Sequence, residues 1–540
     1  MGLYRIAAAI ALFLVASSFW VVSPDKGSDY LGYWIVFTDK DNTTFNPFDY
    51  FDHKAIERRI RHGVCLYDES GFPVRQDYLD SVSQLVQDAG VVSRWMNAVH
   101  VYCLPSDVEK IARLDFVQEV VPASMRLMLA AWPEQWPPSF LFGDPDTTLL
   151  QVQLAHMGIA GFHDRGFNGS GLRIAVFDAG FSGVDTHEAF AHIRQSERII
   201  STWDFHRERE HVYAHSTHGT MTLSVLGGMA GELPMGPASG AEFLLARTEI
   251  FREPLAEEQY WLAAVEWADR LGADIINSSL GYVYHRYFPE QMDGQTSLVA
   301  RAANMAARKG ILVVNAAGNE GKNEQWRVIV TPGDADSVMT VGALDYPSMV
   351  RAEYSSVGPT ADGRLKPNVG VLGKVVAAGR QGYASVTGTS FASPLVAGFA
   401  ACLWQMRPEM QNMDVFRALE RSAHLFPYFD YAHGHGTPHS DYFFGDDTRF
   451  VAPTLDIESD GDQIRIIMRT SISQDGQTDL DAFSGKNYLY YQIKETGGQI
   501  LAYYVVEMED ANKVRMDAAI FEPGQQLIVH YKGYTTAMHF

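Results

Sequence analysis

The first part of the chain, from about residue 31 to 125, mixes two hydrophobic patterns. Some segments alternate hydrophobic and polar residues, as strands do, and others repeat hydrophobic residues at helical spacing. Strands are predicted at 33–37, 98–102 and 116–121, and helices at 77–87 and just after Ser106, which we expect to be an N-cap. This order is compatible with a small α+β domain.

From about residue 150 to 440, compact hydrophobic runs alternate with segments of helical spacing. The predicted strands are 172–177, 241–246, 273–277 and 311–314, and two of the predicted helices are 257–271 and 296–309. Strands that are hydrophobic throughout and separated by helices are typical of a parallel sheet covered on both faces. We therefore predict an α/β domain with a doubly wound, mainly parallel sheet.

The last part of the chain, from residue 446 onward, returns to strand-like alternation. Strands are predicted at 463–470, 488–495 and 500–508, with Gly497-Gly498 as the hairpin turn between the last two. We therefore predict a C-terminal all-β domain. The pattern leaves open whether this domain steadies its neighbour, binds a substrate or directs attachment.

The N-terminus has the pattern of an export signal. Arg5 precedes a hydrophobic run at 6–22, and Ala16-Ser17-Ser18 supplies the small residues that cleavage requires. The run is slightly shorter than a comfortable membrane span, so retention as an N-terminal anchor is the alternative. Further along, the density of proline in Trp132–Pro138 and Gly143–Pro145 predicts an exposed linker.

Composition and charge narrow the functional classes. The 540 residues include 43 Lys and Arg against 65 Asp and Glu, a net charge of −22, which argues against a general nucleic-acid-binding protein. The three cysteines rule out a disulfide-dense scaffold and lack the spacing of a zinc site. Cys65 and Cys103 could pair if the chain is exported, whereas Cys402 lies in a hydrophobic helical stretch.

Four polar residues lie beside glycines, where predicted strands end or helices begin. They are Asp178 in Asp178-Ala179-Gly180, His218 in His218-Gly219-Thr220, Asn319 in Ala316–Gly321 and Ser390 in Gly388–Pro394. Strand ends of a parallel sheet are where catalytic groups gather. A serine hydroxyl needs a base such as imidazole, the imidazole needs a carboxylate that sets its tautomer, and the oxyanion needs fixed donors. The four residues therefore predict nucleophilic catalysis by a serine.

Each motif alone has a plainer explanation. A serine before a helix is usually an N-cap, and a carboxylate at a strand end is often a turn residue. Asn319 could accommodate a left-handed turn. We expect the remaining clustered histidines to face solvent in loops rather than to hold a metal ion: His206, His211, His215, His433, His435 and His439.

The order Asp178, His218, Ser390, together with the motifs around these residues, resembles the subtilisin-like serine proteases, or subtilases. That order separates the family from chymotrypsin-like and α/β-hydrolase enzymes, and it excludes His435 as the base. The resemblance covers most of residues 150–440. It implies that these three residues form a catalytic triad.

The same resemblance assigns two further elements of the site. Asn319 is implied to stabilise the oxyanion, and Ser279-Leu280-Gly281 resembles the segment that pairs with the backbone of an extended peptide substrate. The long segment 282–295 leaves the side-chain preference of the site open. Ser390 lacks the Gly-x-Ser-x-Gly pattern, so a lipase or esterase is disfavoured.

Residues 31–125 resemble, more weakly, the inhibitory pro-domain of the same family. The resemblance implies a precursor in five parts: a signal peptide at 1–22, a pro-domain at 23–125, a linker with the processing site at 126–149, a catalytic domain at 150–445 and a C-terminal β-domain at 446–540. It thus implies a secreted or cell-envelope endopeptidase that works through an acyl-enzyme and processes itself.

The implied enzyme requires no cofactor. Residues 227–235 lack the asparagines that help hold calcium in well-known members, so calcium stays an open alternative and no residue is assigned to a metal. We expect polypeptide substrates, the chain's own pro-domain as inhibitor, no nucleic acid and a monomer. Two other functions stay open: a catalytically silent subtilase fold that serves as a binding module, and a precursor kept latent until another enzyme cuts the linker.

Overall fold

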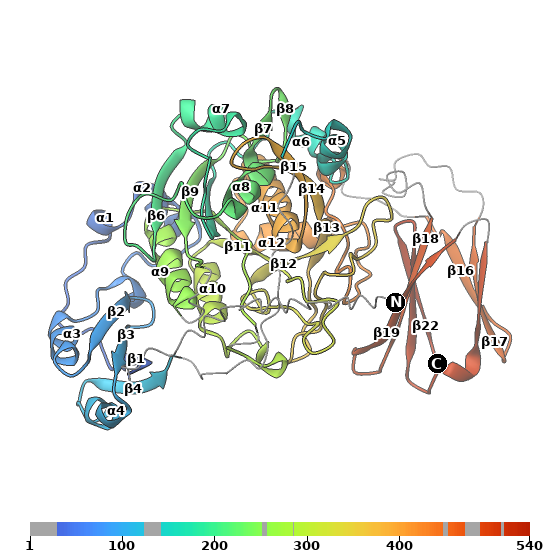
Figure 1. Ribbon diagram of the computed structural model, residues 1–540. Helices are drawn as coiled ribbons and strands as arrows, with labels where there is room; N and C mark the ends of the chain where they lie inside the picture. Colours follow the sequence, from blue (N-terminus) through green and yellow to red (C-terminus); the bar gives the residue numbers. More distant parts are fainter. Residues whose placement is uncertain are drawn as a thin grey trace, which may run out of the picture.

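The computed structural model describes residues 30–123, 142–250, 256–283, 286–445, 452–469, 487–508 and 512–540. The expected signal peptide and the proline-rich segment Trp132–Pro138 lie outside these residues. Figure 1 shows an N-terminal α+β unit on one side of a large α/β body and a C-terminal β-domain on the other side. None of the helices in the described ranges has the length and hydrophobicity needed to cross a membrane.

The N-terminal unit is a four-stranded antiparallel sheet in the order β2-β3-β1-β4. Its elements are β1 (Leu31–Phe37), α3 (Gln76–Ser83), β2 (Asp88–Ser93), β3 (Ala98–Cys103), α4 (Pro105–Ala112) and β4 (Val117–Pro122). Strand alternation divides β1 between two cores: Tyr33, Ile35 and Phe37 pack within the unit, while Trp34 packs against the α/β body. The predicted α+β arrangement is confirmed.

Two details of this unit differ from the sequence prediction. Strand β2 was not predicted, because Asp88–Ser93 contains a glycine and is mostly exposed, so it shows no clear alternation. Ser106 is not an N-cap: α4 begins one residue earlier, at Pro105, because proline is favoured in the first turn of a helix. The pairing of Cys65 with Cys103 does not occur, since Cys65 is exposed and Cys103 is buried, and both are free.

Between β1 and α3 the chain forms an excursion that the sequence pattern did not reveal. It contains α1 (Pro47–Tyr50), α2 (His53–Arg61) and the 3-10 turn η1 (Glu69–Gly71). The side chains of Asn46 and Asp52 accept hydrogen bonds from the first turns of α1 and α2, so both short helices have a capped start.

The central body is built on a seven-stranded sheet in the order β13-β12-β11-β10-β5-β9-β6, in which every neighbouring pair is parallel. The strands are β5 (Arg173–Asp178), β6 (Ile199–Asp204), β9 (Glu242–Arg247), β10 (Ile275–Ser278), β11 (Leu312–Ala316), β12 (Val338–Leu344) and β13 (Val369–Leu372). The four strands predicted from hydrophobic runs are present with small shifts. Edge strand β6 was missed because it is only partly buried.

Helices cover both faces of this sheet. On one face α8 (His218–Gly227) and α11 (Thr389–Met406) pack against the strands, and on the other α9 (Glu257–Arg270) and α10 (Leu298–Arg308) do so. Shorter elements complete the body: α5 (Thr147–Ala155), α6 (Ile159–His163), α7 (Ala191–Gln195), β7 (Met229–Ala230), β8 (Leu233–Pro234), β14 (Lys374–Ala378), β15 (Tyr383–Thr387) and α12 (Asn412–Arg421). The predicted doubly wound α/β sheet is confirmed.

The C-terminal domain contains two antiparallel sheets, β16-β17-β20 and β19-β18-β21-β22, around one hydrophobic core. The strands are β16 (Leu455–Ser459), β17 (Gln463–Met468), β18 (Tyr488–Lys494), β19 (Ile500–Glu507), β20 (Lys513–Asp517), β21 (Gln526–Tyr531) and β22 (Tyr534–His539). Gly498 has φ +87° at the turn between β18 and β19, as the Gly-Gly pair predicts. The all-β prediction is confirmed.

A cluster of buried histidines and tyrosines joins this domain to the central body. The Tyr490 ring on β18 contacts the rings of His424 and His433, with centroids 6.5 and 5.7 Å apart, and also that of His530 on β21 at 6.3 Å. The ring of Tyr428 in the central body also contacts the rings of Tyr490 on β18 and His530 on β21. The expectation that all the clustered histidines face solvent is therefore wrong for His433, which is buried because it packs in this junction.

His439 is a second exception to that expectation, because it is 7% exposed near the end of the central body, where it lies against Gly158. His435 is half-buried, and its ring packs against those of Phe426 and Phe429. The exposed side chains of His206, His211 and His215 agree with the prediction.

We predict that acid weakens the docking of the C-terminal domain. Burial, reinforced by neighbouring histidines, lowers the pKa of His424 to about 3, and burial does the same for His530. At pH values above 6.5, the ordinary pKa of histidine, both neutral side chains therefore favour the docked state. This contribution is lost as the pH falls below 6.5. The loss amounts to up to about 1.4 kcal/mol per pH unit for each histidine.

Hydrogen exchange of β18 and β21 at pH 7 and pH 5, corrected for the intrinsic pH effect, measures this docking. Exchange should rise at pH 5, and His530→Gln should reduce the pH dependence. His206→Gln, at an exposed position, is the matched control. Equal protection at both pH values would contradict the prediction, because it would show that acid does not weaken the docking of this domain.

Candidate active site

The sequence-predicted residues meet at one edge of the central sheet. Asp178 is the last residue of β5, Ser279 follows β10, and Asn319 lies just beyond β11. These three strands are adjacent and parallel, so their carboxyl ends lie side by side. His218 and Ser390 are in the first turns of α8 and α11, which begin at the same edge.

Asp178 and His218 form a buried, directed pair. The Asp178 Oδ1 atom lies 2.8 Å from His218 Nδ1 and also accepts the backbone N–H of Ala179 at 2.7 Å. Asp178 Oδ2 accepts the hydroxyl of Thr222 at 3.1 Å. The carboxylate is fully buried, and these bonds hold it in one orientation. The tautomer with its proton on Nδ1 satisfies this pair, which leaves the imidazole lone pair on Nε2.

Burial and the carboxylate act in opposite directions on His218. Burial lowers the pKa of the imidazole, but the charge of Asp178 and its hydrogen bond raise the pKa more, so the net pKa lies above the ordinary 6.5. His218 is therefore a stronger base than an imidazole with the same burial and no carboxylate.

Ser390 is tied to the segment that follows β10. The Ser390 hydroxyl donates to the carbonyl of Ser279 at 3.2 Å, and the Ser279 hydroxyl donates to the carbonyl of Ser390 at 2.8 Å. The second bond compensates for Pro394, which has no N–H to offer the Ser390 carbonyl four residues earlier in the helix. Gly388 precedes α11 with φ +155° and ψ 154°, a conformation that side chains strongly disfavour.

The ring of Phe391 connects this helix start to the imidazole. Its centroid lies 5.6 Å from that of His218, with the two planes tilted by 42°. Because Phe391 directly follows Ser390, this contact places His218 beside the first turn of α11. The structure thus pairs Asp178 with His218 and places the imidazole beside the helix start that carries Ser390, while the Ser390 hydroxyl itself bonds the Ser279 carbonyl.

Asn319 is oriented by the residue before the serine. Its Oδ1 atom accepts both the backbone N–H and the hydroxyl of Thr389, each at 3.0 Å. With the oxygen held there, the Nδ2 end of the amide points away from Thr389. Nδ2 lies 3.8 Å from the point where a Cβ on Gly388 would be. A side-chain N–H donor is therefore held near Ser390.

A pocket of about 140 Å³ joins these groups. Ser390, Asn319 and the segment Ser279–Gly281 line it, together with Ala316, Val283 and Val330. A Cβ on Gly281 would lie 2.3 Å from Val330 Cγ2, and one on Gly318 would lie 2.6 Å from Val330 Cγ1. The two glycines therefore allow Val330 to pack close against this part of the pocket lining. Asp178 and His218 are not among its lining residues.

Two residues that orient the site were not predicted from the sequence. Thr222 lies four residues after His218, and this helical spacing could have indicated that both side chains face Asp178. Thr389 directly precedes Ser390, but nothing in the sequence shows that its hydroxyl meets Asn319. Over the residues that the structure describes, no cluster of His, Cys, Asp or Glu could hold a metal ion.

Comparison with known proteins gives consistent matches. A profile described as the subtilase family, Peptidase_S8, matches residues 169–445. A second profile, described as the peptidase S8 propeptide domain of Bacteroidota, matches residues 32–134.

Individual relatives match about half of the chain. Subtilisin NAT from Bacillus subtilis subsp. natto is 29% identical over 262 residues, which are 48% of this chain and 62% of that protein. Subtilisin BL from Lederbergia lenta is 30% identical over 265 residues, 48% of this chain and 86% of that protein. A crystal structure of a cold-adapted subtilisin-like serine proteinase is 24% identical, with a TM-score of 0.40 over 51% of this chain and 88% of that one.

We predict that Asp178→Asn lowers the pKa of His218 below 6.5. The variant keeps the burial, which lowers the pKa, and removes the charge that raises it. NMR titration of labelled histidine, with His218→Gln for assignment, measures the shift. A pKa of His218 that is unchanged in the variant would mean that Asp178 does not set it.

Proposed function

The chain belongs to the subtilase family, and on that premise we propose that it is a secreted serine endopeptidase, made as a precursor that processes itself. The observation that supports this most directly is the 2.8 Å bond between Asp178 and His218, formed beside the first turn of the helix that carries Ser390. The described residues supply a base, a nucleophile and an amide donor at one sheet edge. The matched region spans about three fifths of the length of relatives such as subtilisin NAT.

In this reaction Ser390 Oγ attacks the carbonyl carbon of the scissile peptide bond. His218 Nε2 takes the hydroxyl proton and then gives it to the leaving amine, which produces an acyl-enzyme that water hydrolyses by the same steps. Asp178 keeps the Nδ1 proton in place and stabilises the imidazolium that forms in each step. No cofactor is required, and we assign no residue to calcium.

The negative oxygen of the tetrahedral intermediate needs donors that are already in position. Asn319 Nδ2 supplies one, because Thr389 holds the other end of the amide. The backbone N–H of Ser390 supplies a second, in the first turn of α11, where the helix dipole also favours negative charge.

The substrate is a polypeptide in extended conformation. The segment Ser279–Gly281 offers its backbone to the peptide by strand addition, and the pocket beside it receives one substrate side chain. Val283, Val330 and Ala316 form the apolar part of its lining, beside polar groups that include Glu320 and Thr389. We propose that the apolar part receives an apolar side chain of the substrate. A net charge of −22 gives no support to nucleic-acid binding, and we propose a monomer.

The N-terminal unit acts as the inhibitor of the same chain. Its support is the match of residues 32–134 to a peptidase S8 propeptide and its packing against α9. The linker that would be cut is 126–149, and export would depend on the leader at 1–22. A latent precursor and a silent binding protein are the alternatives, and both are outcomes of the following test.

We predict that the purified precursor shortens with time by roughly the mass of the pro-domain, whereas Ser390→Ala stays intact. Intact mass spectrometry measures both chains, and the new N-terminus identifies the bond that was cut. If neither chain shortens and a serine-directed phosphonate labels neither, the chain is silent or latent. Trimming the linker with an added protease then distinguishes a latent enzyme, which becomes labelled, from a silent fold.

We predict that Asn319→Ala lowers kcat by on the order of a hundred- to a thousandfold and changes KM little. In subtilisin itself, loss of the oxyanion asparagine has an effect of about this size, because the donor acts mainly on the transition state. Steady-state kinetics on a peptide substrate measures the two constants. A loss confined to KM would assign Asn319 to substrate binding instead.

A further inference from the structure

Residues 46–72, between β1 and α3, form an arm that reaches the central body away from the N-terminal sheet. Its helix α2 is strongly basic, with Lys54, Arg58, Arg59 and Arg61 within nine residues. In a chain with a net charge of −22, so basic a segment is unusual. Arg58 and Arg59 are 0% and 1% exposed, although arginine is rarely buried without a partner.

The arm binds the sheet edge opposite the candidate active site. Lys54 Nζ donates to the carbonyl of Gly171, just before β5, at 2.6 Å. Arg58 donates to the carbonyls of Ala273, just before β10, and of Lys309, shortly before β11. These are the amino ends of the strands whose carboxyl ends carry Asp178, Ser279 and Asn319. A six-residue strand such as β5 separates the two edges by about 20 Å.

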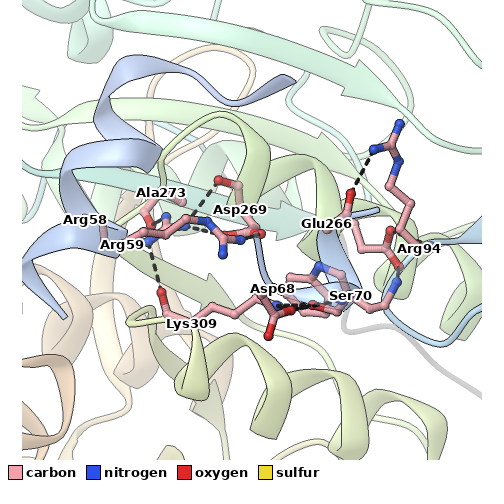
Figure 2. A network of polar contacts seen from close by, with 11 residues as sticks. Arg58, Arg59, Asp68, Ser70, Arg94, Glu266, Asp269, Ala273 and Lys309 are labelled. Carbon is pink, nitrogen blue, oxygen red and sulfur yellow. Dashed lines mark hydrogen bonds and ion pairs between the residues drawn. The ribbon is translucent and has the colours of Figure 1, made fainter. Parts of the chain in front are cut away.

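Arg58 and Arg59 share one carboxylate, that of Asp269 near the C-terminus of α9. Arg58 bonds Asp269 Oδ1 and Arg59 bonds Asp269 Oδ2, and all three side chains are buried (Figure 2). Arg58 also donates to the backbone carbonyl of Asp269 at 3.2 Å. The last carbonyls of a helix lack partners within the helix and carry partial negative charge, so they favour a cation. The Asp269 carboxylate and the carbonyls at this helix end, called the acidic site below, therefore suit two adjacent guanidinium groups.

Further ion pairs surround this centre. Lys54 lies 3.3 Å from Asp274 and 3.6 Å from Glu242 of the central body. In the reverse direction, Lys309 of the central body lies 3.2 Å from Asp68 of the arm and also bonds Ser70. Each partner thus supplies both a cation and a carboxylate to the contact between the arm and the central body.

Two glycines of the central body make room for the arm. A Cβ on Gly272 would lie 2.7 Å from the backbone nitrogen of Ala55, and a Cβ on Gly310 would lie 2.6 Å from the ring of His62. Both glycines have positive φ, +73° and +87°, so both also serve their own turns. Their lack of a side chain is nevertheless what allows this close approach of α2.

The N-terminal sheet has its own, separate contact on α9. Glu266 accepts hydrogen bonds from the Ser93 hydroxyl at 2.5 Å and from the backbone N–H groups of Arg94 and Trp95 at 3.0 and 3.3 Å. Figure 2 shows this contact beside the one at Asp269. In the part of the chain that the structure describes, none of the arm contacts given above involves a residue that lines the pocket at Ser390.

We propose that the arm is a second anchor, which keeps the pro-domain on the catalytic domain after the linker has been cut. This inference rests on the proposed function only in treating the N-terminal unit as a pro-domain. Activation then has two steps, cleavage of the linker and departure of the arm. After the arm has left, the catalytic domain retains the acidic site at Asp269, which fits a helix with two adjacent arginines.

The test uses the full chain with Ser390→Ala, so that no activity of the chain itself is involved. A recognition sequence for a specific protease is placed within 126–141, the chain is cut, and the two fragments are followed by size exclusion and by their dissociation rate. We expect the fragments to co-elute. Arg58→Met should raise the dissociation rate about a hundredfold or more, because it leaves Asp269 with one cation fewer in a buried site.

Arg61→Met is the matched control, since Arg61 lies exposed on the same helix, and its dissociation rate should equal that of the parent chain. Lys54→Met is a milder second variant, for the case that Arg58→Met does not fold, and about a tenfold faster release is expected from it. Hydrogen exchange of the uncut chains adds an independent readout. Arg58→Met should increase exchange in residues 53–61 and leave β1 and β3 protected.

The proposal is overturned if the cut fragments of the parent chain separate at once, or if Arg58→Met and Lys54→Met release the pro-domain no faster than Arg61→Met. These outcomes do not bear on whether Ser390 is a nucleophile, which the phosphonate probe reports on the uncut wild-type chain. A chain that is labelled but releases its pro-domain immediately refutes the anchor and leaves the protease function intact.

Discussion

Parallel pairing of β5, β10 and β11 is the constraint on which both ends of the catalytic body depend. Since all three strands run in the same direction, their carboxyl ends present Asp178, Ser279 and Asn319 at one edge. For the same reason their amino ends, with the C-termini of α9 and α10 beside them, present carbonyl groups and carboxylates at the opposite edge. The first edge suits the chemistry of an oxyanion, and the second suits a cation.

The geometry at the first edge is fixed by bonds among a few polar residues rather than by the sheet alone. Pro394 removes the helical partner of the Ser390 carbonyl, and the Ser279 hydroxyl takes its place. Ser393 adds a bond from the same helix turn to Asn277 on β10, at 2.8 Å. The start of α11 is therefore bonded directly to the strand that leads into the substrate segment. Movement of one would move the other, so Ser390 and the segment Ser279–Gly281 keep their relative positions.

Sequence patterns predicted what depends on local signals and missed what depends on tertiary contacts. Asp178, His218, Asn319 and Ser390 were identifiable because each lies beside glycine at the end of a periodic segment, and family resemblance supplied their order. The bond between Thr389 and Asn319 was not predictable, because the two residues are far apart in the chain. His433 was expected in solvent, since a histidine in a glycine-rich loop gives no sign that a separate domain covers it.

The contacts of the arm, residues 46–72, could not be predicted from local sequence patterns either. A helix with the sequence HKAIERRIR looks like an exposed basic helix, and no periodicity reveals that Arg58 and Arg59 are buried. Their burial follows from Asp269 and from the carbonyls at two helix ends, which only the fold brings together. Among the described residues, none of the arm contacts given above involves Ser390 or the lining of its pocket. The proposed anchor therefore lies at the sheet edge opposite Ser390, and its residues could change in sequence without changing the bonds around Ser390.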